Sequence, residues 1–154
     1  MGALLSIAVR DASRVPMKSL DEAAVTRAAG VAGDFRGTVP GRQVTVVVRE
    51  AWEAACAELD TELPWTTRRA NLLVEGMDLA GTTGSKLVIG DVVLEITGET
   101  DPCGRMEEAL PGLKEALTPE WRAGVMCTVE KEGTIRVGDS VRIESSVVAQ
   151  SGAN

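Results

Sequence analysis

The cysteine at position 103 has the most unusual chemical setting in the sequence, within the segment TDPCGRM at 100–106. Cys103 follows a predicted strand that ends near Thr97 and precedes a predicted helix that begins near Arg105. The partial positive charge of a helix N-terminus and the full charge of Arg105 would both favour the thiolate. The flanking proline and glycine argue against burial in an apolar core. Two interpretations stay open: a functional thiol, or an incidental loop cysteine.

The other two cysteines have the settings of packing residues. Cys56 lies in an alanine-rich predicted helix, and Cys127 lies in a valine-rich predicted strand. Three widely spaced cysteines fit neither a disulfide framework nor a paired CxxC metal site. We therefore expect a reduced, cytoplasmic protein.

Arginines beside predicted turns form a second candidate set. Arginine outnumbers lysine 12 to 4, and guanidinium groups at strand ends can converge on a phosphate or carboxylate with bidentate geometry. The alternative is a set of unrelated solvated arginines, because a GC-rich genome also raises arginine content. The arginines concerned are Arg36, Arg42, Arg68, Arg69 and Arg122.

The composition excludes several classes of function. The chain has no histidine, so no Ser-His-Asp or Cys-His catalytic pair and no histidine metal site can form. A net charge of −7 and a pI near 4.7 predict no nucleic-acid partner. No apolar stretch approaches the roughly 20 residues that span a bilayer, and residues 1–7 lack the basic region of a secretory signal. We expect no membrane association.

The pattern of valine and glycine predicts one mainly β domain over residues 1–154. Valines cluster in short runs that glycine-containing turns separate, which is typical of β-rich domains. The predicted strands are Gln43–Arg49, Asn71–Glu75, Lys86–Ile89, Val92–Thr97, Gly124–Glu130 and Ser140–Ile143. Residues 145–154 lose this periodicity and are expected to fray.

Two helices are predicted, and one segment is ambiguous. Apolar residues at helical spacing predict helices over Glu50–Glu62 and Arg105–Leu117. Pro111 and the glycine after it should break the second helix into two short pieces. The segment Ser19–Gly30 begins like a capping box, which slightly favours a helix, yet its alternating residues also suit a strand.

Several short motifs resemble, in order and spacing, those of the MOSC domain. This domain is the C-terminal module of molybdenum cofactor sulfurases and also occurs as small stand-alone bacterial proteins. The resemblance covers about residues 5–144. Its motifs are Gly33-Asp34-x-Arg36, Arg42-Gln43-Val44, Arg69-Ala70-Asn71-Leu72, Glu75-Gly76-x-Asp78-Leu79, Gly84-x-x-Leu87-x-Ile89-Gly90, Pro102-Cys103, Leu110-Pro111-Gly112-Leu113, Arg122-Ala123-Gly124-Val125 and Gly133-x-Ile135-x-Val137-Gly138-Asp139.

The resemblance implies a fold and a site. The fold would be mainly β (α+β), a barrel like the β-barrel domain of pyruvate kinase with a few short helices, and Glu22–Ala29 would be a strand rather than a helix. The family is thought to carry sulfur as a persulfide on a Pro-Cys cysteine and to bind or modify the molybdenum cofactor. Cys103 would then accept sulfane sulfur from a cysteine desulfurase and pass it to the cofactor or to a molybdoenzyme. The residues implied to bind the anionic cofactor are Arg36, Arg42, Arg69, Asn71 and Arg122.

Two other functions stay open beside this sulfurtransferase-like carrier. Cys103 could be a molybdenum ligand within a reductase system, or the chain could bind another anionic metabolite with Cys103 as a bystander. Pyridoxal phosphate is not expected to bind, because the separate pyridoxal-dependent domain of the full-length sulfurases does not fit in 154 residues. Many relatives carry histidine shortly after the Gly-Asp pair, where this chain has Phe35 and Arg36.

Overall fold

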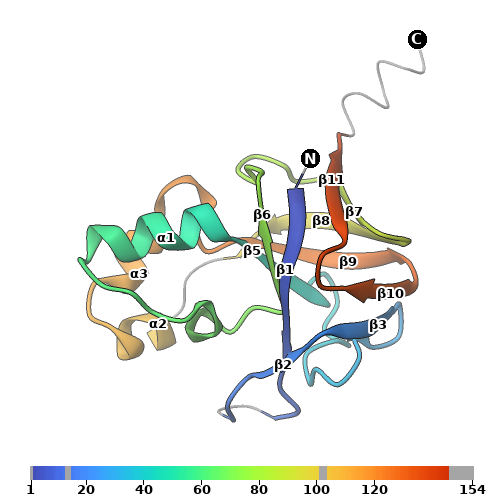
Figure 1. Cartoon of the computed structure of the whole chain (residues 1–154), viewed down its shortest axis with the longest axis horizontal. Coiled ribbons are helices and arrows are strands. Elements are labelled where there is room, and N and C mark those ends of the chain that lie inside the picture. Colours follow the sequence, from blue (N-terminus) through green and yellow to red (C-terminus); the bar gives the residue numbers. More distant parts are fainter. Residues whose placement is uncertain (1, 13–14, 101–103, 146–154) are drawn as a thin grey trace.

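Short valine-rich segments pair into a closed barrel of seven strands (Figure 1). The computed structural model describes residues 2–12, 15–100 and 104–145. Within them, the strand order is β11-β7-β8-β9-β5-β6-β1, and pairing of β11 with β1 closes the barrel. The barrel strands are β1 (Gly2–Val9), β5 (Val44–Val48), β6 (Leu72–Glu75), β7 (Lys86–Ile89), β8 (Val92–Glu99), β9 (Val125–Lys131) and β11 (Ser140–Glu144).

Four further strands lie beside the barrel. β2 (Lys18–Leu20) pairs with β1, and the remaining three form a small antiparallel sheet in the order β10-β3-β4. Their bounds are β3 (Glu22–Thr26), β4 (Gly30–Val31) and β10 (Gly133–Arg136). Side chains of both sheets meet in one apolar core, to which β3 contributes Ala23 and Val25.

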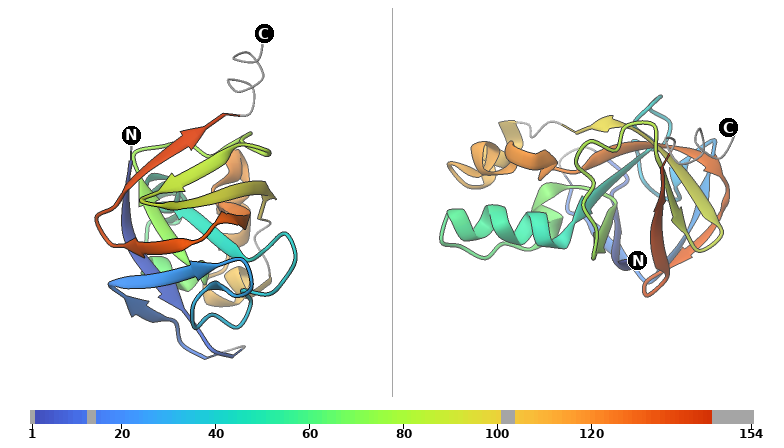
Figure 2. Two further views of the ribbon diagram at one scale, coloured as in Figure 1. Left: turned by 90° about the vertical axis from the view of Figure 1, so that its right-hand side faces the viewer. Right: turned by 90° about the horizontal axis from the view of Figure 1, so that it is seen from above.

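The helices gather on one side of the barrel, as the view from above in Figure 2 shows. They are α1 (Arg49–Glu58), η1 (Trp65–Arg68), α2 (Gly104–Ala109), α3 (Leu113–Leu117) and η2 (Pro119–Trp121). α1 connects β5 to β6, which pair in parallel and therefore need such a crossover. A second apolar core lies between α1, α2, α3 and the outer face of β5 and β6, around Trp52, Met106, Leu113 and Leu117.

The mainly β barrel and the six predicted strands are confirmed, and no strand end differs from the prediction by more than two residues. The strand implied over Glu22–Ala29 is confirmed as β3 but ends at Thr26, because residues 27–29 form the turn that leads to β4. The helical alternative for Ser19–Gly30 is therefore wrong. Ala23 and Val25 alternate with exposed neighbours, and this burial pattern has the period of a strand. β1, β2, β4 and β10 were not predicted. A register shift between Leu4 and Ser6 disturbs the alternation of buried residues in β1.

The helical predictions are confirmed in type and corrected in length. α1 ends at Glu58 rather than Glu62, because Asp60 adopts a left-handed backbone with φ of 51°. The second predicted helix is divided into α2 and α3, and Gly112 stands at the break with φ of 92°. Among the described residues, the longest helix has ten residues, and none is long and apolar enough to cross a membrane. The tail expected to fray lies, from residue 146 on, outside the described residues.

Gly124 permits a close approach of two strands that a side chain would prevent. Gly124 and Gly138 both have a positive φ, 103° and 98° respectively. A Cβ on Gly124 would lie 2.1 Å from the carbonyl oxygen of Val46, whereas a Cβ on Gly138 would meet nothing within 4 Å.

We expect Gly138→Ala to lower the free energy of unfolding by about 1–2 kcal/mol. Gly124→Ala should lower it by about 3–5 kcal/mol, because β5 must also move. Urea denaturation of both variants measures the difference, and equal losses would contradict this account.

Candidate functional site

A buried arginine organises the junction between the barrel and the helices. Arg68, the last residue of η1, is 7% exposed. Its Nε donates to the carbonyl oxygen of Ala123 at 2.8 Å, and its Nη2 donates to Oγ1 of Thr100 at 2.9 Å. Thr100 directly follows β8, and Ala123 precedes β9 by two residues. One side chain therefore ties η1 to the ends of two neighbouring barrel strands.

A cavity of about 540 Å³ lies beside η1. The residues around it come from η1, the residue directly after η1, the segment before β2 and the end of α2, and they are Pro16, Met17, Thr66, Thr67, Arg69, Glu108 and Ala109. This volume lies within the roughly 300–1,000 Å³ that small-molecule sites occupy. The polar groups of these residues are one guanidinium, two hydroxyls and one carboxylate. Most of them can donate hydrogen bonds, which suits an anionic ligand.

The local backbone determines how Arg69 reaches this cavity. Pro64 has the extended conformation that precedes a helix start, and η1 ends where Arg69 turns left-handed with φ of 63°. The Arg69 guanidinium, partly buried, donates to the carbonyl oxygen of Val15 at 3.2 Å. Arg68 and Arg69 are adjacent, yet one is directed into the junction and the other lines the cavity.

The predicted thiol Cys103 lies outside the described residues, in the segment 101–103. The described residues on either side are Thr100, which Arg68 holds, and Gly104, which begins α2. Glu108 and Ala109 of α2 line the cavity. The segment that carries Cys103 thus connects the residue held by Arg68 to a helix that forms one wall of the cavity.

Two predicted arginines lie on exposed loops. Arg36 follows β4, and Arg42 precedes β5. The guanidinium carbons of Arg10 and Arg36 lie 5.0 and 5.2 Å from the centroid of the Phe35 ring. The Asp34 carboxylate accepts hydrogen bonds from the backbone N–H groups of Arg10 (3.2 Å) and Arg36 (3.3 Å). The Gly-Asp motif therefore holds the backbone of this loop.

Asn71 has its side chain inside the barrel wall. Its Oδ1 accepts from the backbone N–H of Thr45 at 3.1 Å, and its Nδ2 donates to the carbonyl oxygen of Ala8 at 3.3 Å. These bonds link β1, β5 and the start of β6, and the residue is 5% exposed. Asn71, two residues after Arg69, therefore links barrel strands through its side-chain hydrogen bonds.

Arg122 lines a different cavity from Arg69. Its Nη1 contacts Oε2 of Glu58 at 2.5 Å and donates to the carbonyl oxygen of Ala116 at 3.0 Å. The cavity beside it, of about 250 Å³, lies between α1, η2 and the segment that contains Met77. The structure therefore does not bring Arg69 and Arg122 together.

Cys56 and Cys127 are buried in the two apolar cores, which confirms that they are packing residues. Burial raises the pKa of both thiols. Both side chains are therefore protonated at neutral pH and poorly nucleophilic. No group of three or more potential metal ligands is found in the part of the chain that the structure describes.

The burial of Arg68 was not predictable from its sequence neighbours. It was one of the arginines beside predicted turns, but only the tertiary structure distinguishes it from exposed Arg42. Gln43 was missed in the same way: this buried side chain donates to the carbonyl oxygen of Gly37 at 3.1 Å and accepts from the N–H of Val129 at 2.9 Å. Its position within a motif was the available signal, and its role is structural.

The contact between Arg68 and Thr100 can be measured with a double-mutant cycle. We expect Arg68→Met to lower the free energy of unfolding by about 2–4 kcal/mol, because buried acceptors lose their donor. The coupling energy with Thr100→Val should be about 1–2 kcal/mol. The matched control pairs Arg42→Met with Thr100→Val and should show no coupling. A coupling of zero for Arg68 would contradict the described geometry.

Comparison with known proteins agrees with this architecture. No curated protein sequence matches the chain. Among solved structures, YuaD from Bacillus subtilis superimposes with a TM-score of 0.78 at 21% identity, over 94% of this chain and 97% of that one. YiiM from Geobacillus stearothermophilus gives 0.75 at 15% identity, over 93% and 75%. At these identities the likeness shows a common fold.

The family is shown by the sequence itself. The sequence profile of the MOSC domain matches residues 33–142, which include all of the strands from β5 to β10, the helices and the segment 101–103. The profile thus contains η1 and α2, whose residues line the 540 Å³ cavity. The chain belongs to the MOSC domain family.

Proposed function

We propose that this MOSC protein is a sulfur carrier that acts on the molybdenum cofactor or on a molybdoenzyme, with Cys103 as the carrying residue. The observation that supports this most is the pair of hydrogen bonds from Arg68 to Thr100 and Ala123. These bonds hold Thr100, which stands three residues before Cys103 and four residues before α2. Two residues of α2 line the cavity that suits an anion. Arg68 is thus a positioning residue.

The donors around the cavity fit the anionic end of the molybdenum cofactor. The guanidinium of Arg69 and the hydroxyls of Thr66 and Thr67 would hold its phosphate. The carboxylate of Glu108 suits the amino and ring N–H donors of a pterin. When bound, the cofactor supplies a metal centre that takes sulfur as a ligand. We assign the phosphate to Arg69 rather than Arg122, because Glu58 already neutralises Arg122.

The carrying step is a sulfur transfer between thiols. The Cys103 thiolate attacks the outer sulfur of the persulfide on a cysteine desulfurase. The sulfur–sulfur bond of the donor breaks, and the donor cysteine leaves as a thiolate while Cys103 becomes a persulfide. No external oxidant is needed, since one sulfur–sulfur bond replaces another. An acceptor nucleophile that takes the outer sulfur regenerates the Cys103 thiolate.

The sulfur transfer to Cys103 can be followed by mass spectrometry of the intact protein. We expect incubation with a cysteine desulfurase and isotopically labelled cysteine to add the mass of one labelled sulfur atom to the intact protein. Peptide mapping should place it on Cys103, because the other two thiols are buried and protonated. Cys103→Ser should abolish the label, whereas Cys56→Ala should retain it. Label on Cys56 or Cys127, or no label at all, would rule out the carrier.

A second candidate function is the binding of another anionic metabolite. It is favoured by one observation: the donors around the cavity belong to η1 and Arg69, so anion binding does not require Cys103. A third, in which Cys103 is a molybdenum ligand, predicts that metal copurifies with the protein and is lost in Cys103→Ser.

Anion binding is tested with inorganic pyrophosphate and isothermal titration calorimetry. We expect Arg69→Gln to weaken binding about tenfold or more, because a charge-assisted hydrogen bond is lost. Arg42→Gln removes the same charge from an exposed loop and should leave the affinity unchanged. Equal weakening by both variants would contradict a site at Arg69. Unchanged affinity in Cys103→Ser, together with absent sulfur transfer in the mass experiment, would favour the metabolite-binding function.

A further inference from the structure

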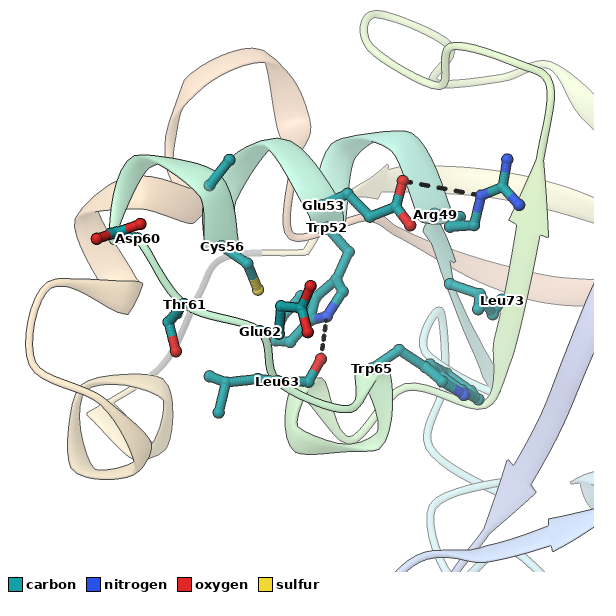
Figure 3. Close-up of a pocket in the computed structure, with 11 residues that line it drawn as sticks. Arg49, Trp52, Glu53, Cys56, Asp60, Thr61, Glu62, Leu63, Trp65 and Leu73 are labelled. Carbon is teal, nitrogen blue, oxygen red and sulfur yellow. Dashed lines mark hydrogen bonds and ion pairs between the residues drawn. The ribbon is translucent and has the colours of Figure 1, made fainter.

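A groove that is larger than the 540 Å³ cavity lies between α1 and the segment that leads to η1 (Figure 3). Its volume is about 980 Å³. The apolar side chains that line it include Trp52, Leu63, Trp65 and Leu73. Trp52 is held in place, because its indole N–H donates to the carbonyl oxygen of Leu63 at 3.0 Å. The groove therefore offers a largely preformed aromatic and aliphatic surface.

Carboxylates surround this apolar surface. Glu53, Asp60 and Glu62 line the groove. Glu53 forms an ion pair with Arg49 at 4.0 Å (Figure 3), whereas neither Asp60 nor Glu62 forms an ion pair with another described residue. Arg49 is the one cation among the described lining residues, and Glu75 neutralises it at 2.8 Å. The groove is consequently apolar at its base and negatively charged at its rim.

The groove is elongated along α1. Its lining residues on and directly after this helix stand at positions 49, 52, 53, 56, 57 and 60, which is the spacing of one helix face over its whole length. Ten helical residues span about 15 Å. An extended peptide covers about the same distance with four or five residues. The shape matches a short stretch of chain better than a single small molecule.

We propose that this groove is a docking surface for a basic segment of a partner protein. An apolar side chain of the partner would pack on Trp65 and Leu63, which are partly exposed, above Trp52, which is only 4% exposed. The lysine or arginine side chains of the partner would face Asp60 and Glu62. Aromatic residues in a desolvated pocket typically carry much of the affinity of an interface. Complementary charge at the rim provides steering and specificity. The net charge of −7 adds to the attraction.

The docking surface lies next to the candidate site. Trp65 lines the groove, while Thr66 and Thr67, the next two residues of η1, line the 540 Å³ cavity. A partner seated in the groove would therefore be adjacent to the cavity in which the anionic ligand is proposed to bind. The docking inference is independent of the chemistry at Cys103 and is measured without it.

Calorimetry with synthetic peptides tests the surface. The probe is a six-residue peptide, capped at both ends, in which lysine and leucine alternate. We expect saturable binding with one peptide per protein. Two comparison peptides replace either the lysines with glutamate or the leucines with serine, and neither should bind measurably. Absence of binding by the first peptide, or equal binding by the serine peptide, would overturn the proposal.

Matched variants locate the binding. The double variant Asp60→Asn with Glu62→Gln should weaken binding of the probe about three- to tenfold, and Trp65→Ala should weaken it at least as much. The control, Asp91→Asn with Glu95→Gln, removes the same two charges from exposed positions around β8. Equal weakening by the control would reveal non-specific attraction to an acidic protein and contradict the assignment. Circular dichroism confirms that each variant is folded.

Discussion

The buried guanidinium of Arg68 is the constraint on which the region around the 540 Å³ cavity depends. A charged group with 7% exposure is costly unless its donors are satisfied. Here the donors go to Ala123 and Thr100, which lie at the ends of two paired barrel strands. The backbone N–H of Thr100 donates to the carbonyl oxygen of Gly124 at 3.0 Å and joins the same junction. The Arg68 side chain and this backbone hydrogen bond together hold η1, the ends of the two strands and Thr100 in place relative to one another.

This junction connects the two halves of the molecule. The barrel is closed by hydrogen bonds between β1 and β11 and filled with valine, leucine and isoleucine. The helices pack around a separate apolar core on one side of it. η1 lies between the two, and its consecutive residues face a cavity on one side and a groove on the other. A short 3-10 helix thereby places a proposed ligand site and a proposed docking surface next to each other.

Much of the fold was predictable because its strands are short valine runs with clear turns, and the family motifs supplied the barrel and β3. β1 was missed, since the irregularity between Leu4 and Ser6 removes its alternation. The candidate site was predictable only in part. Arginine and asparagine in a motif look alike whether they bind a ligand or the backbone, and the structure places Asn71 in the barrel wall. The burial of Arg68 depends on the pairing of β8 with β9, which no local pattern contains.

Amide hydrogen exchange under native conditions tests the role of Arg68 most directly. The amides of Thr100 and Gly124 donate to the carbonyl oxygens of Gly124 and Trp121, at and directly beside the junction. They are compared with the amides of Ile89 and Val141, which pair at the other end of the barrel. Our account predicts that Arg68→Met accelerates exchange at Thr100 and Gly124 well beyond any change at Ile89 and Val141. Uniform acceleration at all four amides, or none at the junction, would contradict it.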